Sequence, residues 1–180
     1  KGGDILYRWG NPQVYDKGLS SDQQLFAQHD VQWIEAGHPE AGNLIVFNNG
    51  NGRYPAYSSV DIIRPTLDNG TYALQANGTF GPDLPAWSWD QGEAMYSGAI
   101  SGAQALPNGN VLVTHGTQGT LYEVSQNGDV VWEYIGPIGA NGPFNQSEPI
   151  PEGKRAGSTA NAIFKATHYS EAFLNATGQT

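Results

Sequence analysis

The stretch AQALPNGNVLVTHG at residues 103–116, continued by TQGTLYEVS (117–125) and NGDVVWEY (127–134), decides the fold class. In VLVTHG and TLYEVS, apolar and polar residues alternate with a period of two, the pattern of a half-buried strand. Asn108-Gly109 and Asn127-Gly128 separate these runs, and Asn-Gly pairs favour the tight turns of hairpins. The stretch therefore predicts a unit of four antiparallel strands within residues 96–136.

A longer copy of this unit precedes it, and we expect it within residues 25–92. Its predicted strands lie in HDVQWIEAG (29–37), NLIVFNNG (43–50), YSSVDIIRP (57–65), TYALQA (71–76) and AWSWDQG (86–92), with insertions that lengthen the loops. Two flanking segments resemble parts of the same unit. Residues 3–12 end in a tryptophan segment typical of an outer strand, and NAIFKATHYSEAF predicts the first strand of a further unit within 161–175, after a loop at 137–160.

Repeated four-stranded antiparallel units are the blades of β-propellers. The composition agrees with an all-β fold, because Gly (24) and Pro (11) are abundant and charged residues make up only 14%. We expect a propeller portion with about two complete blades plus flanking strands. Propeller rings typically contain 4 to 8 blades. The two units are therefore expected to pack with remaining blades or with other chains in a homo-oligomer.

Charge and composition exclude several classes of function. The formal charge is -9 and no basic cluster occurs, so neither nucleic acid nor an anionic membrane is an expected partner. No apolar run is long enough to span a bilayer. The chain has no cysteine, and its four histidines lack metal-ligand spacing, so we expect no metal and no cofactor. Glycosylation is possible in a secreted protein at the sequons of Asn69, Asn77, Asn145 and Asn175.

His29 is the leading candidate for a catalytic residue. The alternative is a histidine that only hydrogen-bonds loop backbone at the start of a strand. Asp30 is expected on the opposite face of that strand, where it cannot orient the His29 ring. In NNGNGR, small residues and Arg53 suit an anion, although a hairpin turn with a solvated arginine explains the same letters. His115 occupies the corresponding place in the second unit, so a pocket shared by His29, Arg53 and His115 is predicted.

Four segments taken together resemble the arylsulfotransferase family. They are QHDVQW (28–33), NLIVFNNGNGR (43–53), YSSVDI (57–62) and the run from Tyr96 to Tyr134. The resemblance covers most of residues 3–135. It implies a six-bladed propeller, exported to the periplasm or outside the cell, that moves a sulfuryl group from an aryl sulfate to a phenol. By motif, His29 matches the transiently sulfated histidine. Asn49, Arg53 and Tyr57 match neighbouring motif positions and are expected to bind substrate, with His115 as a further contact.

Two departures from the family pattern favour a second hypothesis. Asp30 stands where characterised members carry threonine, and the further histidines, asparagine and arginine that those enzymes draw from other blades are not in these 180 residues. The alternative function is a non-catalytic secreted propeller module with a binding, structural or filament role. An assay of sulfuryl transfer with and without His29 distinguishes the two hypotheses.

Overall fold

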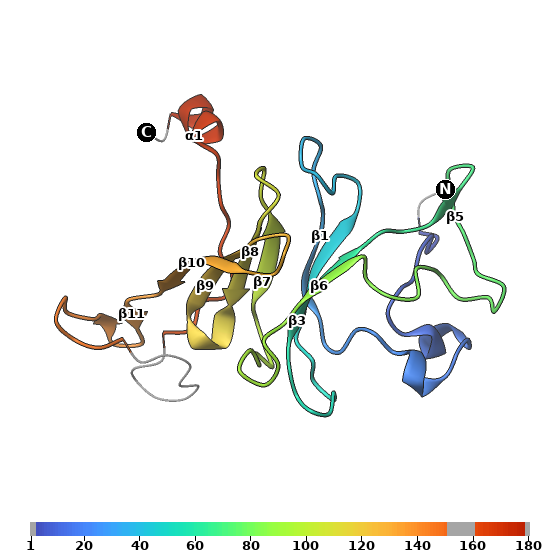
Figure 1. Cartoon of the computed structure of the whole chain (residues 1–180), viewed down its shortest axis with the longest axis horizontal. Helices are drawn as coiled ribbons and strands as arrows, with labels where there is room; N and C mark the ends of the chain where they lie inside the picture. The colour runs from blue at the N-terminus through green and yellow to red at the C-terminus, as the bar shows by residue number, and fades with distance from the viewer. Residues whose placement is uncertain (1–2, 151–160, 179–180) are drawn as a thin grey trace.

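The computed structural model describes residues 3–150 and 161–178, and its main strands form two four-stranded antiparallel sheets that lie side by side (Figure 1). The first sheet has the order β1 (His29–Trp33), β2 (Leu44–Asn48), β3 (Ser59–Ile63) and β6 (Trp87–Trp89). The second has the order β10 (Val130–Ile135), β9 (Thr120–Val124), β8 (Val111–His115) and β7 (Gly102–Ala105). The predicted all-β class is confirmed, whereas closure of these sheets into a propeller stays a prediction.

The remaining elements are short and lie outside the two sheets. They are the hairpins β4 (Leu67–Asp68) with β5 (Thr71–Tyr72) and β11 (Ile138–Gly139) with β12 (Gly142–Pro143), the 3-10 helices η1 (Pro12–Tyr15), η2 (Ser20–Asp22) and η3 (Gly116–Gln118), and the helix α1 (Glu171–Thr177). Figure 1 shows α1 projecting away from both sheets near the C-terminus.

Glycine-dependent turns join the strands of the second sheet, as its sequence predicts. In the β7–β8 turn the Gly109 amide donates to the Leu106 carbonyl at 2.9 Å, and in the β9–β10 turn the Gly128 amide donates to Ser125 at 2.9 Å. Both glycines have φ 88, a left-handed conformation that side chains disfavour. The two turns thus repeat the same geometry and fix the register of the strands that they connect.

The core lies between the two sheets. Phe47, Val60 and Trp89 come from the first sheet, and Val113 and Val124 come from the second; all belong to one buried cluster. Each such side chain contributes about 1.5–3 kcal/mol on burial. β2 and β3 are buried along almost their whole length, and residues of both sheets hold the units together.

Tryptophan side chains join each unit to the next. Trp89 Nε1 donates to the Gly128 carbonyl at 3.0 Å and Trp87 Nε1 donates to Gln126 at 3.0 Å, so β6 of the first sheet is anchored on the β9–β10 turn of the second. In the N-terminal segment Trp9 Nε1 donates to the Pro82 carbonyl at 2.6 Å. Trp132, the corresponding residue of β10, is 46% exposed.

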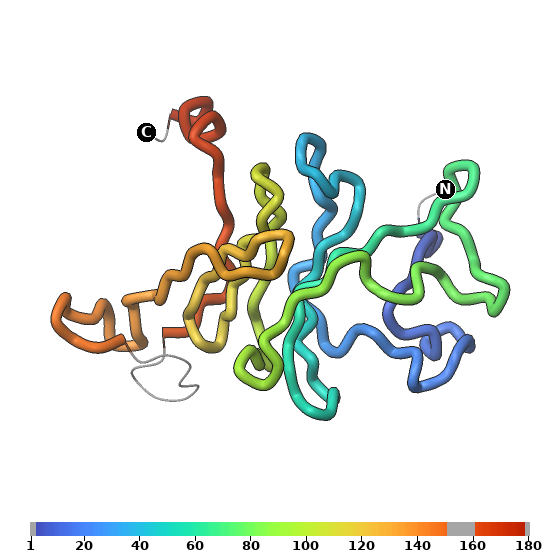
Figure 2. The backbone as a smooth tube through the Cα atoms, in the orientation of Figure 1, coloured from blue at the N-terminus to red at the C-terminus, as the bar shows by residue number. Residues whose placement is uncertain are grey.

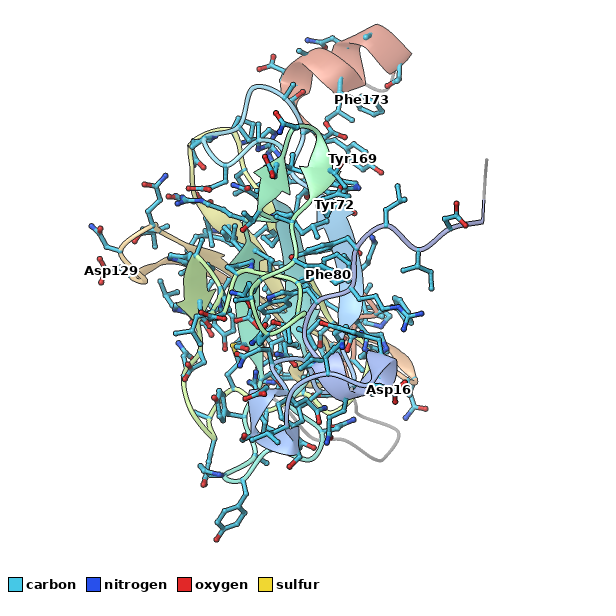
Figure 3. The ribbon with its side chains drawn as sticks, turned by 90° about the vertical axis from the view of Figure 1, so that its right-hand side faces the viewer. Asp16, Tyr72, Phe80, Asp129, Tyr169 and Phe173 are labelled. Atoms are coloured by element: carbon cyan, nitrogen blue, oxygen red, sulfur yellow. The ribbon has the colours of Figure 1, made fainter. Side chains whose placement is uncertain are left out.

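The prediction of an outer strand at residues 3–12 is wrong. No strand forms there, and this segment runs beside the loop around residue 81 (Figure 2). A strand requires a ladder of backbone hydrogen bonds, and side chains make the contacts of this segment with the residue 81 loop instead. Tyr7 donates to the Gly81 carbonyl at 2.8 Å, and its ring centroid lies 4.8 Å from that of Tyr72 and 5.4 Å from that of Phe80. Tyr72 and Phe80 are labelled in Figure 3.

Two further predicted strands also fail to form as expected. TYALQA does not join the first sheet: β5 pairs with β4 in a separate hairpin, because β6 already occupies the free edge of β3. Within 161–175, residues 161–168 are irregular and α1 follows. Ser170 caps that helix by accepting a hydrogen bond from Phe173 N at 3.2 Å, which favours helix over strand. In the predicted loop at 137–160, a short hairpin forms, and residues 151–160 lie outside the described residues.

Candidate functional site

The three motif segments meet at Asn49, at the end of the first sheet. His29 begins β1, and its Nδ1 lies 2.7 Å from Asn49 Oδ1. Asn49 directly follows β2. Ser58, just before β3, donates from Oγ to the Asn49 carbonyl at 2.8 Å. Sequence positions 29, 49 and 58 are therefore joined by hydrogen bonds because β1, β2 and β3 are neighbours in one sheet.

Asn49 is fully buried, and every polar atom of its side chain has a partner. Its Nδ2 donates to the Ser97 carbonyl at 2.6 Å and to the Ile100 carbonyl at 3.0 Å, while Oδ1 faces His29. We predicted that Asn49 contacts substrate, but the structure places its side chain in the protein interior. Its amide contacts the His29 ring and a loop, and it has no exposed surface.

A buried hydroxyl network supports this loop from the second sheet. Ser97 Oγ lies 2.8 Å from Ser101 Oγ, and Ser101 Oγ also accepts from the Gly116 amide at 2.9 Å. Thr117 donates from its backbone amide to Ser97 Oγ at 3.2 Å. Because residues 116 and 117 follow β8, the second sheet fixes the loop that contacts Asn49.

Arg53 lies in a cavity of its own, next to aromatic rings. Its guanidinium carbon is 4.4 Å from the ring centroid of Tyr57 and 5.3 Å from that of Phe26, and NH1 donates to Ser59 Oγ at 3.1 Å. Arg53, Tyr57 and Phe26 line a cavity of about 320 Å³. No carboxylate pairs with Arg53 in the part of the chain that the structure describes. A guanidinium whose acceptors are neutral, here Ser59 Oγ and the Gln24 carbonyl at 3.3 Å, keeps its charge uncompensated and beside aromatic rings suits an aryl anion.

Neither His115 nor His29 lines the cavity of Arg53, so this cavity does not bring the three predicted residues together. His115 ends β8 and is fully buried, and neither ring nitrogen has a hydrogen-bond partner among the described residues. Burial lowers the pKa of its imidazole. We predicted that His115 binds substrate, but the structure places its side chain in the protein interior, because both faces of β8 are covered.

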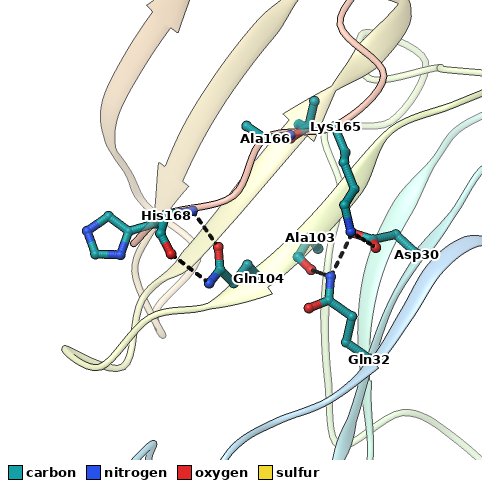
Figure 4. A network of polar contacts seen from close by, with 8 residues as sticks. Asp30, Gln32, Ala103, Gln104, Lys165, Ala166 and His168 are labelled. Carbon is teal, nitrogen blue, oxygen red and sulfur yellow. Dashed lines mark hydrogen bonds and ion pairs between the residues drawn. The ribbon is translucent and has the colours of Figure 1, made fainter. Parts of the chain in front are cut away.

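Asp30 contacts residues other than His29. It forms an ion pair with Lys165 at 2.7 Å and accepts a hydrogen bond from Gln32 Nε2 at 2.8 Å (Figure 4). Its φ of 55 is left-handed, and the register of β1 against β2 shifts between His29 and Gln32. Asp30 thus links the first sheet to the C-terminal segment.

Three residues important to this region carried no clear signal in the sequence. Ser97 and Ile100 contribute backbone carbonyls, which any residue supplies. The residue types in YSGAIS therefore do not predict these hydrogen bonds. Asp61 is 3% exposed in β3, where an alternating pattern gives no reason for a carboxylate. The only available signal was the concentration of small residues around 97–102, which is typical of close backbone contact.

Several other predictions concern the surface. Asn69, Asn77, Asn145 and Asn175 are all exposed, and their glycosylation stays a prediction. Among the described residues, no three acidic or histidine side chains are placed to hold a metal ion. In residues 3–150 and 161–178, no helix is both long and apolar enough to cross a membrane.

Comparison with known proteins identifies the family. The sequence profile of the family described as Arylsulfotransferase (ASST) matches residues 4–136. No match to the chain was found among curated proteins or among solved structures. The matched region contains β1, β2 and β3, whose ends meet at Asn49, and it makes up well over half of the chain. The chain therefore belongs to the arylsulfotransferase (ASST) family.

Proposed function

We propose that this protein transfers a sulfuryl group from a phenolic sulfate ester to a phenol, with His29 as the nucleophile. The observation that carries the proposal is the position of the His29 ring, half-buried where three segments of the family-matched region meet. One ring nitrogen is engaged by Asn49 at 2.7 Å, and the other forms no hydrogen bond with the described residues. A ring held at one nitrogen and open at the other is suited to nucleophilic attack.

The proposed reaction consists of two displacements at sulfur. In the first, the lone pair of a His29 ring nitrogen forms a bond to sulfur, the bond from sulfur to the aryl oxygen breaks, and the phenolate leaves with that electron pair and takes a proton from water. In the second, the acceptor phenol loses a proton to water, and its oxygen attacks sulfur. The nitrogen–sulfur bond then breaks, and its electron pair returns to the ring. No atom changes oxidation state, and two half-reactions give ping-pong kinetics.

Arg53 and Tyr57 are the proposed contacts for the aryl sulfate. The cavity that they line offers one cation between two aromatic rings, and Phe26, which also lines it, lies three residues before His29. A guanidinium can donate to sulfuryl oxygens without competing as an acceptor. We further propose that the protein is exported, with further blades or a second chain completing the site around His29.

The test is an assay with a chromogenic phenyl sulfate as donor and a phenol as acceptor. We expect His29→Ala to abolish transfer, whereas His168→Ala should leave it unchanged, because the exposed ring of His168 makes no hydrogen bond in the described structure and only its backbone contacts Gln104. Equal activity of both variants and the unaltered protein would exclude His29 as the nucleophile.

A trapping experiment examines the intermediate directly. The protein is mixed with donor in the absence of acceptor and quenched under alkaline conditions. Peptide mass spectrometry should then find one added sulfuryl group on the peptide that contains His29, and none on the same peptide of the His29→Ala variant. A sulfuryl group on another histidine would contradict the assignment.

The second candidate function is a non-catalytic module that binds or assembles with other proteins. The observation that favours it is the set of exposed apolar side chains on β10, the edge strand of the second sheet, where Val131, Trp132 and Tyr134 are 56%, 46% and 43% exposed. Such surfaces mark interaction sites. This function predicts no transfer in the assay and a change in assembly state, measured by light scattering, when Trp132 and Tyr134 are replaced by serine.

A further inference from the structure

The orientation of the Asn49 amide is fixed by its surroundings. Its Nδ2 lies 2.6 Å from the Ser97 carbonyl and 3.0 Å from the Ile100 carbonyl. A carbonyl oxygen can only accept a hydrogen bond, so both positions require the amide nitrogen and exclude the amide oxygen. The opposite amide orientation would place one oxygen against two others. Oδ1 of Asn49 must therefore face His29.

This orientation determines which nitrogen of His29 carries the proton. Asn49 Oδ1 is an acceptor, and it lies 2.7 Å from His29 Nδ1, so Nδ1 must donate. In a neutral imidazole only one nitrogen is protonated, and Nε2 then holds the free lone pair. We propose that Asn49 is a positioning residue that holds His29 in the Nδ1-protonated tautomer, with Nε2 directed to substrate. The catalytic meaning of this tautomer rests on the proposed function.

The loop that fixes Asn49 is itself held in an unusual conformation. Ile100 has φ 50 and Ser101 has φ 83, and a left-handed conformation is a clear outlier for a β-branched residue. Such conformations persist only where the surroundings over-determine them, and they concentrate at functional sites. The Ser101 amide donates to the Phe164 carbonyl at 2.9 Å, and the Ser97 amide donates to Ser58 Oγ at 2.9 Å. The two carbonyls that face Asn49 are thus fixed from several sides.

The same contact stabilises the charge that forms during transfer. When Nε2 bonds to sulfur, the ring becomes a cation and its proton remains on Nδ1. A hydrogen bond from a charged donor is stronger than one from a neutral donor. The Nδ1–Asn49 hydrogen bond therefore stabilises the sulfated ring more than the free ring, and this difference lowers the barrier.

A spectroscopic experiment tests the tautomer without any assay of activity. Long-range proton–nitrogen correlation spectra of the ¹⁵N-labelled protein distinguish protonated from unprotonated ring nitrogens. We expect a protonated Nδ1 and an unprotonated Nε2 for His29 above neutral pH. His168, whose exposed ring makes no hydrogen bond in the described structure, is the reference for an unconstrained ring. A dominant Nε2-protonated form of His29 would overturn the proposal, whether or not the protein transfers sulfuryl groups.

Variants of Asn49 separate positioning from support of the loop. Asn49→Leu should lose the tautomer preference and lower kcat roughly 10- to 100-fold, as removal of a residue that orients a functional histidine does, with little change in KM. Asn51→Leu is the matched control. Asn51 also donates to a carbonyl of this loop, that of Gly98 at 2.7 Å, but does not contact His29. The Asn51→Leu variant should therefore retain the His29 tautomer and kcat.

Asn49→Asp keeps an acceptor opposite Nδ1 and should keep Nδ1 protonated, although its second carboxyl oxygen then faces the Ser97 and Ile100 carbonyls and lowers the stability of the loop. If neither variant folds, the ring nitrogens of the unaltered protein still decide the proposal. An unprotonated Nδ1 in Asn49→Asp would overturn the proposal, and so would equal losses of kcat in Asn49→Leu and Asn51→Leu, because equal losses indicate a purely structural role. If Asn49→Asp retains the Nδ1-protonated ring while no protein transfers sulfuryl groups, the positioning stands and the proposed function fails.

Discussion

At the scale of single residues, Gly50 shows why the motif turn needs glycine. Its φ is 79, and a Cβ atom built there would overlap the carbonyl oxygen of Tyr57. Gly70 has the same φ of 79 but nothing within 4 Å of the corresponding position. We expect Gly70→Ala to lower the free energy of unfolding by about 1–2 kcal/mol, the cost of the left-handed conformation alone. Gly50→Ala should cost at least about 2 kcal/mol more, because the overlap adds to that cost.

Urea denaturation of both variants measures this difference. Equal losses of stability at the two positions would mean that the turn relaxes away from Tyr57 without cost. The comparison isolates the close backbone contact, since both substitutions add the same methyl group at the same φ.

His115 should give the folding stability a recognisable dependence on pH. Burial lowers its pKa in the folded state below the ordinary 6.5, so the unfolded chain binds the proton more readily. As the pH falls through about 6.5, the free energy of unfolding should therefore decrease, by at most about 1.4 kcal/mol per pH unit from this residue. Above that pH both states are neutral at His115, and the contribution is flat.

Urea denaturation between about pH 8 and pH 5 checks this expectation. His115→Gln should have the shallower dependence, because glutamine does not titrate. His168→Gln, a change at an exposed histidine, should retain the full slope. The same slope in all three proteins would show that His115 does not contribute.

At the scale of elements, a buried carboxylate joins three strands of the first sheet. Asp61 in β3 accepts from Ser88 of β6 at 2.6 Å, from Ser59 of β3 at 3.1 Å and from Asn48 of β2 at 3.1 Å. A buried carboxylate with three donors is satisfied, and its loss leaves those donors unpaired. We expect Asp61→Ala to lower the free energy of unfolding by at least about 3 kcal/mol.

Thermal and urea unfolding of Asp61→Ala measure this loss. Asp68→Ala is the control, because Asp68 lies exposed in the β4–β5 hairpin and its side chain accepts a hydrogen bond from the neighbouring Asn69. That change should stay within about 0.5 kcal/mol. A similarly small effect at Asp61 would show that water replaces the carboxylate in the variant.

At the scale of the whole molecule, tryptophan anchors join the sheets. Trp89 is 6% exposed and donates to the Gly128 carbonyl at 3.0 Å, whereas the indole of Trp132 is 46% exposed and makes no hydrogen bond in the described structure. Trp89→Phe removes the hydrogen bond and part of the buried volume, and should cost roughly 1–3 kcal/mol. Trp132→Phe should change the stability by no more than about 0.5 kcal/mol.

Both variants are compared by urea denaturation with tryptophan fluorescence as the signal. A large loss at Trp132 would mean that the face of β10 is covered in solution, as a further blade or a second chain would cover it. Equal stability of Trp89→Phe and the unaltered protein would show that the sheets are held by the apolar core alone.

Local patterns in the sequence determined the strands and turns of the second sheet. Alternation in VLVTHG and TLYEVS, with glycine at positions 109 and 128, fixed strands that pair with their immediate neighbours. The motif segments also sufficed to indicate His29, Arg53 and the family. These features could be predicted because strand periodicity and turn conformation depend on residues that are close in sequence.

Only the tertiary structure decided which side chains meet. The cavity of Arg53 includes neither His29 nor His115, and His29 instead contacts Asn49, which two carbonyls from 48 and 51 residues further along the chain hold in place. Segments 3–12 and 161–175 have sequences typical of strands but form no strand. Strand formation requires a partner edge, and a carbonyl contact depends on backbone position rather than residue type, so neither leaves a pattern in the local sequence.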